Sequence, residues 1–269
     1  MIDYVLPSAA RDPIMLEIFD AEGKIVRRFA SDDNPVRPQA RQYFAGDWLQ
    51  PLAPLPARPG HNRFVWNLRT LRPKAPDYDF SIAAVPGVDT PVVPQGLFVP
   101  PGKYEVRLTA NGHTSSQPLT VAMDPRVKVA PADLAAQHDF YGALAQALER
   151  NTSALERITA IADRLKKLDA ELAGNAALQQ TAKRVAADVD RYHAGTGEEN
   201  LDAVANVLTA QVTDVESCDC APTAPQREVF ETYRKRLDAA LAKWQALASG
   251  PLADLDRQVR AAGLAPVVP

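Results

Sequence analysis

The sequence predicts an α+β fold of two domains. An antiparallel β-sandwich of the fibronectin type III or immunoglobulin kind is expected over residues 1–124, followed by an α-helical bundle over residues 125–269. Apolar residues alternate with period two as far as Val121, and they recur with the 3.6-residue period of a helix from Pro131 onward. A length of 269 residues with 46% hydrophobic content also favours two modest domains over one.

The first domain is predicted from short runs of alternating apolar residues separated by turns. Two turns, Asp20–Gly23 and Asn111–Gly112, are typical of hairpins because their glycines adopt backbone angles that other residues avoid. We expect Phe64, Trp66 and Leu68 to share one face of a strand. The predicted strands cover residues 2–6, 14–19, 24–29, 63–68 and 103–109, and a last strand that ends near residues 119–121.

Two long proline-rich segments interrupt these strands, at residues 31–60 and 70–101. Loops of this length are uncommon in compact domains unless they are functional or packed against a neighbour. Their aromatic content argues for docking over disorder. Five aromatics could form a stacking platform for a sugar, or they could be buried anchors that hold the loops, and we favour the anchors. These candidate ligand-binding residues are Tyr43, Phe44, Trp48, Tyr78 and Phe80.

The second domain is predicted from a long amphipathic helix that runs from Pro131 to Leu172 and stops at Gly174. Proline is tolerated in a first helical turn, and glycine is typical just past a helix end. The apolar residues of the helix form a narrow stripe, which needs partner helices to cover it. The stripe consists of Leu144, Leu148, Leu155, Ile158, Ile161, Ala162, Leu165, Leu168 and Leu172, with Asn151 at one position of the repeat.

Shorter helices with short connections complete the predicted bundle. Thr223 and Gln226 have the spacing of a capping box at the start of one of them, and Gly250–Pro251 is expected to break that helix. The shorter helices are expected at residues 176–193, after the cap Asn200, after Thr223, and at residues 252–262.

Composition excludes some classes of partner. The net charge of −3 and the pI near 5.8 give no electrostatic reason to expect nucleic acid. No run of about 18 apolar residues is present, so no membrane span is expected, and the N-terminus lacks the pattern of a signal peptide. The strand-like alternation begins directly after Met1, which favours a fragment of a longer protein.

Several runs of residues, taken in order, resemble one family. The runs are Ile2–Leu6, Leu16–Ile18 with Asp20–Gly23 and Val26–Phe29, Asn62–Arg69, Pro100–Tyr104 with Val106 and Leu108, Ala221–Phe230 and Gly263–Pro266. Together they resemble the C-terminal region of bacterial BNR-repeat proteins, which carry sortilin (VPS10)-like β-propellers and are often labelled glycosyl hydrolases. The resemblance extends over essentially the whole chain.

The resemblance implies a partner and a setting. The propeller that precedes this region in the family has no counterpart here, because the chain contains no Asp-box run of the form Ser-x-Asp-x-Gly-x-x-Trp. No catalytic residue can therefore be carried over. A β-propeller, in the same chain or in a partner, is the expected neighbour, and a periplasmic or secreted location is the implied setting.

Cysteine and histidine side chains are the first candidates for metal ligands. Cys218 and Cys220 could bind a soft metal or act in redox chemistry, but zinc sites need four ligands, and their cysteine pairs are usually spaced by two to four residues. Cysteines without a chemical role are favoured. The histidines are far apart in sequence, at His61, His113, His138 and His193. No metal site and no cofactor is predicted.

Serine, histidine and aspartate side chains are the candidates for catalysis. Ser115 and Ser116 lie close to His113, but no Gly-x-Ser-x-Gly elbow accompanies them. Asp77 and Asp79 could act as paired carboxylates of a glycosidase, yet their spacing directs them to opposite sides of an extended chain. No catalytic residue is predicted.

The expected function is that of a non-catalytic accessory or interaction module. Such a module would pack on a β-propeller or mediate protein contacts. The alternative is that the chain is the substrate-contacting part of a secreted glycoside hydrolase and binds carbohydrate through the loop aromatics.

Overall fold

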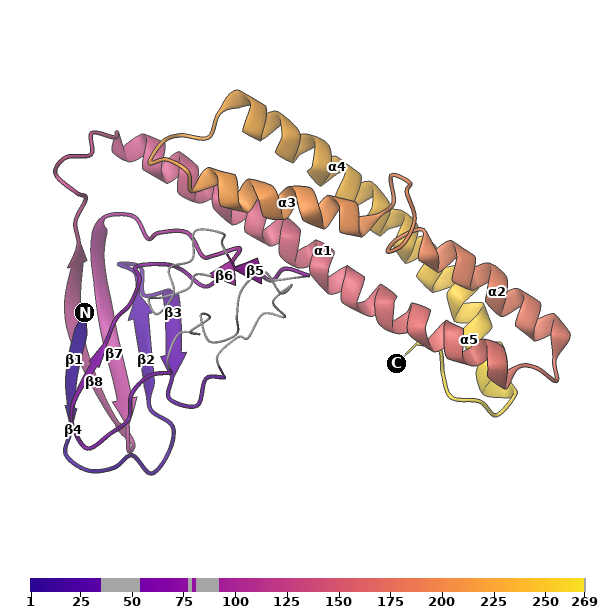
Figure 1. The fold of residues 1–269 in the computed structure, drawn as a ribbon, viewed down its shortest axis with the longest axis horizontal. Helices are drawn as coiled ribbons and strands as arrows, with labels where there is room; N and C mark the ends of the chain where they lie inside the picture. Colours follow the sequence, from indigo (N-terminus) through magenta and orange to yellow (C-terminus); the bar gives the residue numbers. More distant parts are fainter. Residues whose placement is uncertain (35–53, 77–78, 81–91, 269) are drawn as a thin grey trace. The chain divides into compact units, whose positions relative to one another are not determined.

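A computed structural model describes residues 1–34, 54–76, 79–80 and 92–268, and its fold is mixed α and β (Figure 1). The chain divides into two compact units. Unit 1 comprises residues 1–73, 77–141 and 215–221, and unit 2 comprises residues 74–76, 142–214 and 222–269. Regular structure changes from strand to helix between Val121 and Pro131, whereas the units divide inside a helix. The predicted boundary at residue 125 stays a prediction.

One antiparallel sheet of unit 1 has the strand order β3-β2-β7-β8. Its strands are β2 (Met15–Phe19), β3 (Ile25–Ala30), β7 (Gly102–Ala110) and β8 (His113–Val121). Both predicted hairpin turns are confirmed. Asn111 and Gly112 have φ angles of 49° and 78°, as a two-residue turn with positive φ at both positions requires. In the other turn the Asp20 carboxylate accepts hydrogen bonds from the N–H groups of Glu22 and Lys24.

The remaining strands form two small antiparallel pairs. β1 (Ile2–Leu6) pairs with β4 (Gly60–Phe64), and β5 (Asp79–Phe80) pairs with β6 (Val92–Val93). A single cluster of buried side chains brings together residues from β1, β2, β4 and β7. Its buried members are Leu6, Ile14, Leu16, Ile18, Leu55, Phe64, Trp66, Val99 and Tyr104.

The strand predicted at residues 63–68 is placed wrongly. β4 ends at Phe64, and the chain turns soon afterwards because the Asn67 carboxamide accepts a hydrogen bond from the Arg69 N–H at 3.3 Å. Leu68 has a φ of 59° and is 39% exposed, so it does not share the buried face of Phe64 and Trp66. A side-chain turn has here overridden an alternating pattern.

The long helix is confirmed as α1 (Pro131–Glu171). Every residue of its predicted stripe is buried, with exposures of 5% or less. Asn151 is fully buried among them, and its side-chain N–H donates to the carbonyl oxygen of Leu201 at 3.0 Å. The stripe is therefore a packing surface, as its period predicted.

The shorter helices are α2 (Ala176–Asp190), α3 (Leu201–Val215), α4 (Ala224–Leu247) and α5 (Ala253–Ala261). Asn200 caps α3, as predicted, by accepting a hydrogen bond from the Ala203 N–H. The predicted break at Gly250–Pro251 is confirmed, because α4 ends at Leu247 and a separate helix, α5, begins at Ala253. A π-helical turn over Ala248–Leu252, which contains Pro251, joins the two helices. The wider turn accommodates a residue that has no N–H to donate. No described helix is long and apolar enough to cross a bilayer.

Loss of the α4 cap is expected to destabilise unit 2 by about 1 kcal/mol. The Thr223 hydroxyl accepts a hydrogen bond from the Gln226 N–H, and the Gln226 side chain accepts one from the Thr223 N–H. Thr223→Ala removes the first of these bonds, whereas the control Thr223→Ser keeps a hydroxyl. Urea denaturation followed by circular dichroism measures the difference. Equal stability of the alanine and serine variants would show that the cap contributes nothing.

Candidate functional site

The five candidate aromatics, favoured as buried anchors over a sugar platform, lie mostly outside the described residues. Tyr43, Phe44, Trp48 and Tyr78 lie outside the described residues. Phe80 belongs to β5 by its backbone, and the position of its side chain is not described. The candidate ligand-binding role of these residues remains a prediction. Of the two acids weighed as a glycosidase pair, Asp77 is outside the described residues and Asp79 lies in β5.

The described histidines are dispersed over different elements. Nε2 of His61 lies 3.3 Å from the Asp3 carboxylate, and Nε2 of His193 lies 3.0 Å from the Asp190 carboxylate. His113 begins β8, and His138 lies in α1. Within the part of the chain that the structure describes, no group of three or more His, Cys, Asp or Glu side chains is arranged to hold a metal ion.

Of the two serines near His113, Ser116 lies on the outer face of the four-stranded sheet, opposite Arg107, whereas Ser115 pairs with Leu108 on the other face. The Ser116 hydroxyl donates to the Glu105 carboxylate at 3.0 Å, and Nη2 of Arg107 lies 2.9 Å from the same carboxylate. The Arg107 guanidinium also lies 4.2 Å from the centre of the Phe19 ring. These contacts join three neighbouring strands across a solvent-facing surface. The role they indicate for Ser116 is cross-strand pairing.

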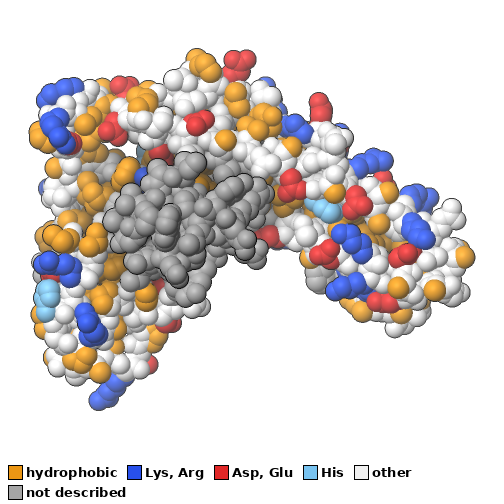
Figure 2. Space-filling model, in the orientation of Figure 1, with side chains coloured by type: hydrophobic (Ala, Val, Ile, Leu, Met, Phe, Trp, Pro, Cys, Tyr) orange, Lys and Arg blue, Asp and Glu red, His pale blue; other side chains and the backbone are white. Residues whose placement is uncertain are grey.

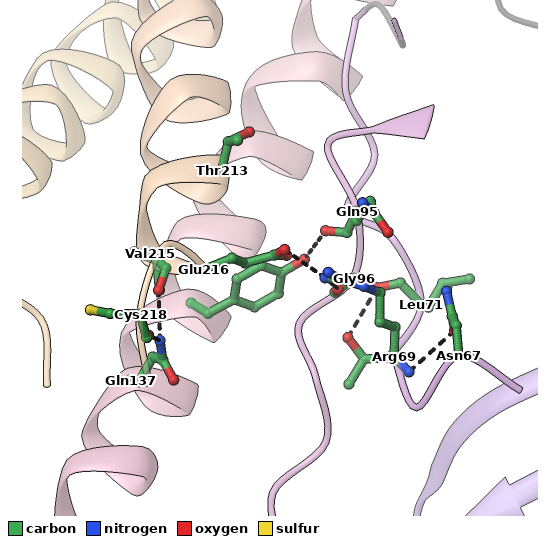
Figure 3. A network of polar contacts seen from close by, with 12 residues as sticks. Asn67, Arg69, Leu71, Gln95, Gly96, Gln137, Thr213, Val215, Glu216 and Cys218 are labelled. Carbon is green, nitrogen blue, oxygen red and sulfur yellow. Dashed lines mark hydrogen bonds and ion pairs between the residues drawn. The ribbon is translucent and has the colours of Figure 1, made fainter. Parts of the chain in front are cut away.

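Arg69 and Glu216 form the least exposed ion pair among the described residues (Figure 3). Nη1 of Arg69 lies 2.5 Å from the Glu216 carboxylate, and the two side chains are only 13% and 14% exposed. The same Nη1 donates to the Gly96 carbonyl oxygen at 2.7 Å, and the guanidinium lies 3.9 Å from the centre of the Phe98 ring. The pair therefore connects the segment after β4, the segment after β6 and the segment after α3.

Burial raises the pKa of the Glu216 carboxyl, and the hydrogen bond and charge of Arg69 oppose that rise. The second carboxylate oxygen, Oε1, is buried and has no hydrogen-bond partner among the described residues. Arg69 and Glu216 are separated by 147 positions in the sequence, so no local pattern could have identified them. Because each charge is already balanced by the other, the pair indicates a structural role.

Two side chains of α1 extend this network (Figure 3). The Tyr141 hydroxyl donates to the Gln95 carbonyl oxygen at 2.7 Å, and burial, followed by the charge of Glu216, raises the pKa of this hydroxyl. The Gln137 amide donates to the carbonyl oxygens of Val215 and Cys218, both at 2.6 Å. The start of α1 thus holds both the segment after β6 and the segment after α3.

Cys218 and Cys220 form a disulfide in the segment after α3. Cys218 is exposed and Cys220 is half-buried. The sequence pattern predicted cysteines without a chemical role, and a bond between residues this close was not expected.

A hollow of about 490 Å³ lies beside the turn between β2 and β3 and the start of β7. Its apolar lining includes Ile25 and Leu71, which are 50% and 68% exposed. Figure 2 shows hydrophobic side chains exposed between charged ones over the strands of unit 1. The charged lining residues carry both signs, and they are Asp20, Glu22, Lys24 and Lys103.

Two polar side chains of the hollow, Asp20 and Tyr104, are engaged by the protein itself. The Asp20 carboxylate accepts two backbone hydrogen bonds, and the Tyr104 hydroxyl donates to the Pro100 carbonyl oxygen at 2.7 Å. Burial raises the pKa of the Tyr104 hydroxyl. The hollow therefore offers apolar contact with a charged surround, which is the composition of a protein-binding surface.

Comparisons with known proteins give no further guidance. No family model, curated protein or solved structure matches the chain.

Proposed function

We propose that this chain is a non-catalytic accessory module that packs on a β-propeller or mediates protein contacts. The observation that carries the proposal is the hollow of unit 1, where exposed Ile25 and Leu71 adjoin charges of both signs. An apolar centre within a polar surround favours a protein partner over a polyanion. A propeller is the partner because the sequence runs resemble the region that follows a propeller in BNR-repeat proteins.

The fold proposed for unit 1 is a fibronectin type III or immunoglobulin-like sandwich, and the proposed fold of the helices is a bundle. The sandwich is supported by the shared buried cluster, to which both the β1–β4 pair and the four-stranded sheet contribute. The bundle is supported by the buried stripe of α1 and by the edge-to-face packing of Tyr192 and Trp244, whose ring centres lie 5.3 Å apart.

A periplasmic or secreted location is part of the proposal. The disulfide between Cys218 and Cys220 supports it, because disulfides persist in oxidising compartments and are rare in the cytosol. The resemblance to BNR-repeat proteins implies the same setting.

A binding measurement tests the proposed docking. The reading frame upstream of Met1 in the source genome is first inspected for an in-frame propeller, which is then produced and titrated with this chain by calorimetry. Ile25→Asp and Leu71→Asp are each expected to weaken binding about tenfold or more, because they place a charge in an apolar contact. Val229→Asp is the matched control, since Val229 is 39% exposed on α4 in unit 2.

Two outcomes would contradict this proposal. One is an encoded propeller whose binding is absent or is unaffected by both substitutions in the hollow. The other is binding on a glycan array that Trp48→Ala abolishes, because this result would favour the alternative role as the substrate-contacting part of a glycoside hydrolase. A panel of chromogenic glycosides completes the test, and turnover by the isolated chain would contradict a non-catalytic role.

A further inference from the structure

The Cys218–Cys220 disulfide is placed where a reductant can reach it. Cys218 is exposed, and in Figure 3 its sulfur is directed away from the Arg69–Glu216 pair. The chain contains only two cysteines, so no third thiol of the same molecule can compete for either sulfur. Exposed disulfides are the ones that exchange readily with thiols.

Because the two cysteines are so close in sequence, their disulfide contributes little to the free energy of unfolding. The stabilisation that a disulfide provides by restricting the unfolded chain grows with the number of residues in the loop it closes. Here the sequence separation is two, which is close to the smallest loop possible. Opening the bond should therefore leave the fold intact, and a purely structural purpose is a weak explanation for it.

The backbone around the disulfide is held by contacts that do not involve sulfur. Gln137 donates to the carbonyl oxygens of Val215 and Cys218, and the Glu216 carboxylate is bound by Arg69. These contacts flank Cys218 and survive cleavage of the sulfur–sulfur bond. The two thiols would consequently stay close together, and the bond could form again within one molecule.

We propose that Cys218 and Cys220 form a reversible thiol–disulfide exchange site whose reaction partner is a dithiol. A thiolate of the dithiol attacks Sγ of exposed Cys218, the sulfur–sulfur bond breaks, and Cys220 leaves as a thiolate that takes up a proton. The second thiolate of the dithiol then attacks the mixed disulfide and releases Cys218, which is protonated in turn. The dithiol is oxidised by two electrons, and the protein disulfide is reduced to two thiols.

Reduction of the native full chain by dithiothreitol tests the proposal. Samples are quenched with N-ethylmaleimide and weighed by intact-mass spectrometry, while circular dichroism follows the fold. We expect two thiols per chain to appear together at millimolar dithiothreitol with an unchanged spectrum. The rate should rise about tenfold per pH unit below the pKa of the reductant, because the thiolate is the attacking species. After the reductant is removed, reclosure should be independent of protein concentration.

Two results would overturn the proposal. Labelling that appears only after denaturant is added would show that the bond is inert in the fold. Two labelled thiols in protein purified under air, without reductant, would show that no bond forms. Gln137→Ala tests the positioning argument separately, since reclosure should slow about fivefold when the clamp on Cys218 is lost. An unchanged reclosure rate in a folded Gln137→Ala variant would show that Gln137 does not position Cys218.

Discussion

Replacing Arg69 by methionine is expected to destabilise unit 1 by about 3–5 kcal/mol. Methionine keeps most of the apolar volume of the side chain but leaves the Glu216 carboxylate, which is only 14% exposed, without its counter-charge. The substitution also removes a hydrogen bond to the Gly96 carbonyl oxygen and the contact with the Phe98 ring. Chemical denaturation followed by circular dichroism measures the loss, and hydrogen exchange of residues 215–221 locates it.

Arg107→Met is the matched control for this prediction. Arg107 also pairs with a carboxylate and also lies over an aromatic ring, but its side chain is 40% exposed on the outer face of the sheet. A surface pair of this kind contributes no more than about 1 kcal/mol. If Arg69→Met and Arg107→Met lower the free energy of unfolding by the same amount, burial of the Arg69–Glu216 pair has no energetic consequence. The double variant Arg69→Met/Glu216→Leu should recover most of the lost stability, because no buried charge then remains.

The same pair gives a pH dependence with a definite sign. Burial raises the pKa of Glu216 in the folded chain above its ordinary value of 4.5. The folded state then binds the proton more tightly than the unfolded state, so the stabilisation is complete below about pH 4.5 and is lost as the pH rises through the folded-state pKa. Arg69→Met should steepen this decline, and Glu216→Gln should remove it. If the Glu216→Gln variant still loses stability as the pH rises, the titration of another group causes that loss.

Replacing Leu168 by alanine is expected to destabilise unit 2 by about 2–5 kcal/mol. Leu168 is fully buried on the stripe of α1, so truncation removes packed methyl groups and leaves a cavity. Val229→Ala on α4 is the control, because Val229 is 39% exposed and its truncation should change stability by no more than about 0.5 kcal/mol. Urea denaturation followed by circular dichroism compares the variants. Similar losses at the two positions would contradict the placement of the stripe in a packed core.

Much of the secondary structure could be predicted because it depends on neighbours in the sequence. The capping box of Thr223, the hairpin at Asn111–Gly112 and the stripe of α1 each arise from residues a few positions apart. Leu68 was placed wrongly for the same reason, since its alternation with Phe64 and Trp66 carries no information about the turn at Asn67. A local pattern predicts an element but does not fix where a side-chain hydrogen bond ends it.

The candidate sites depend on contacts that no local pattern contains. Arg69 and Glu216 meet across 147 positions, and Tyr141 reaches a carbonyl oxygen 46 positions away. The hollow gathers residues from the β2–β3 turn, the start of β7 and α1, and each of these residues is unremarkable within its own segment. The disulfide could not be predicted because cysteines separated by a single residue are rarely bonded to each other.

The buried amide of Asn151 specifies the register in which the helices of unit 2 pack. A stripe made only of leucine and isoleucine would tolerate a slide of one helical turn at little cost, because one apolar side chain can replace another. The amide cannot be moved in this way, since its N–H is matched to a single carbonyl oxygen, that of Leu201. Any shifted arrangement would strand that donor away from water. One polar side chain thereby selects a single register from several of nearly equal packing energy.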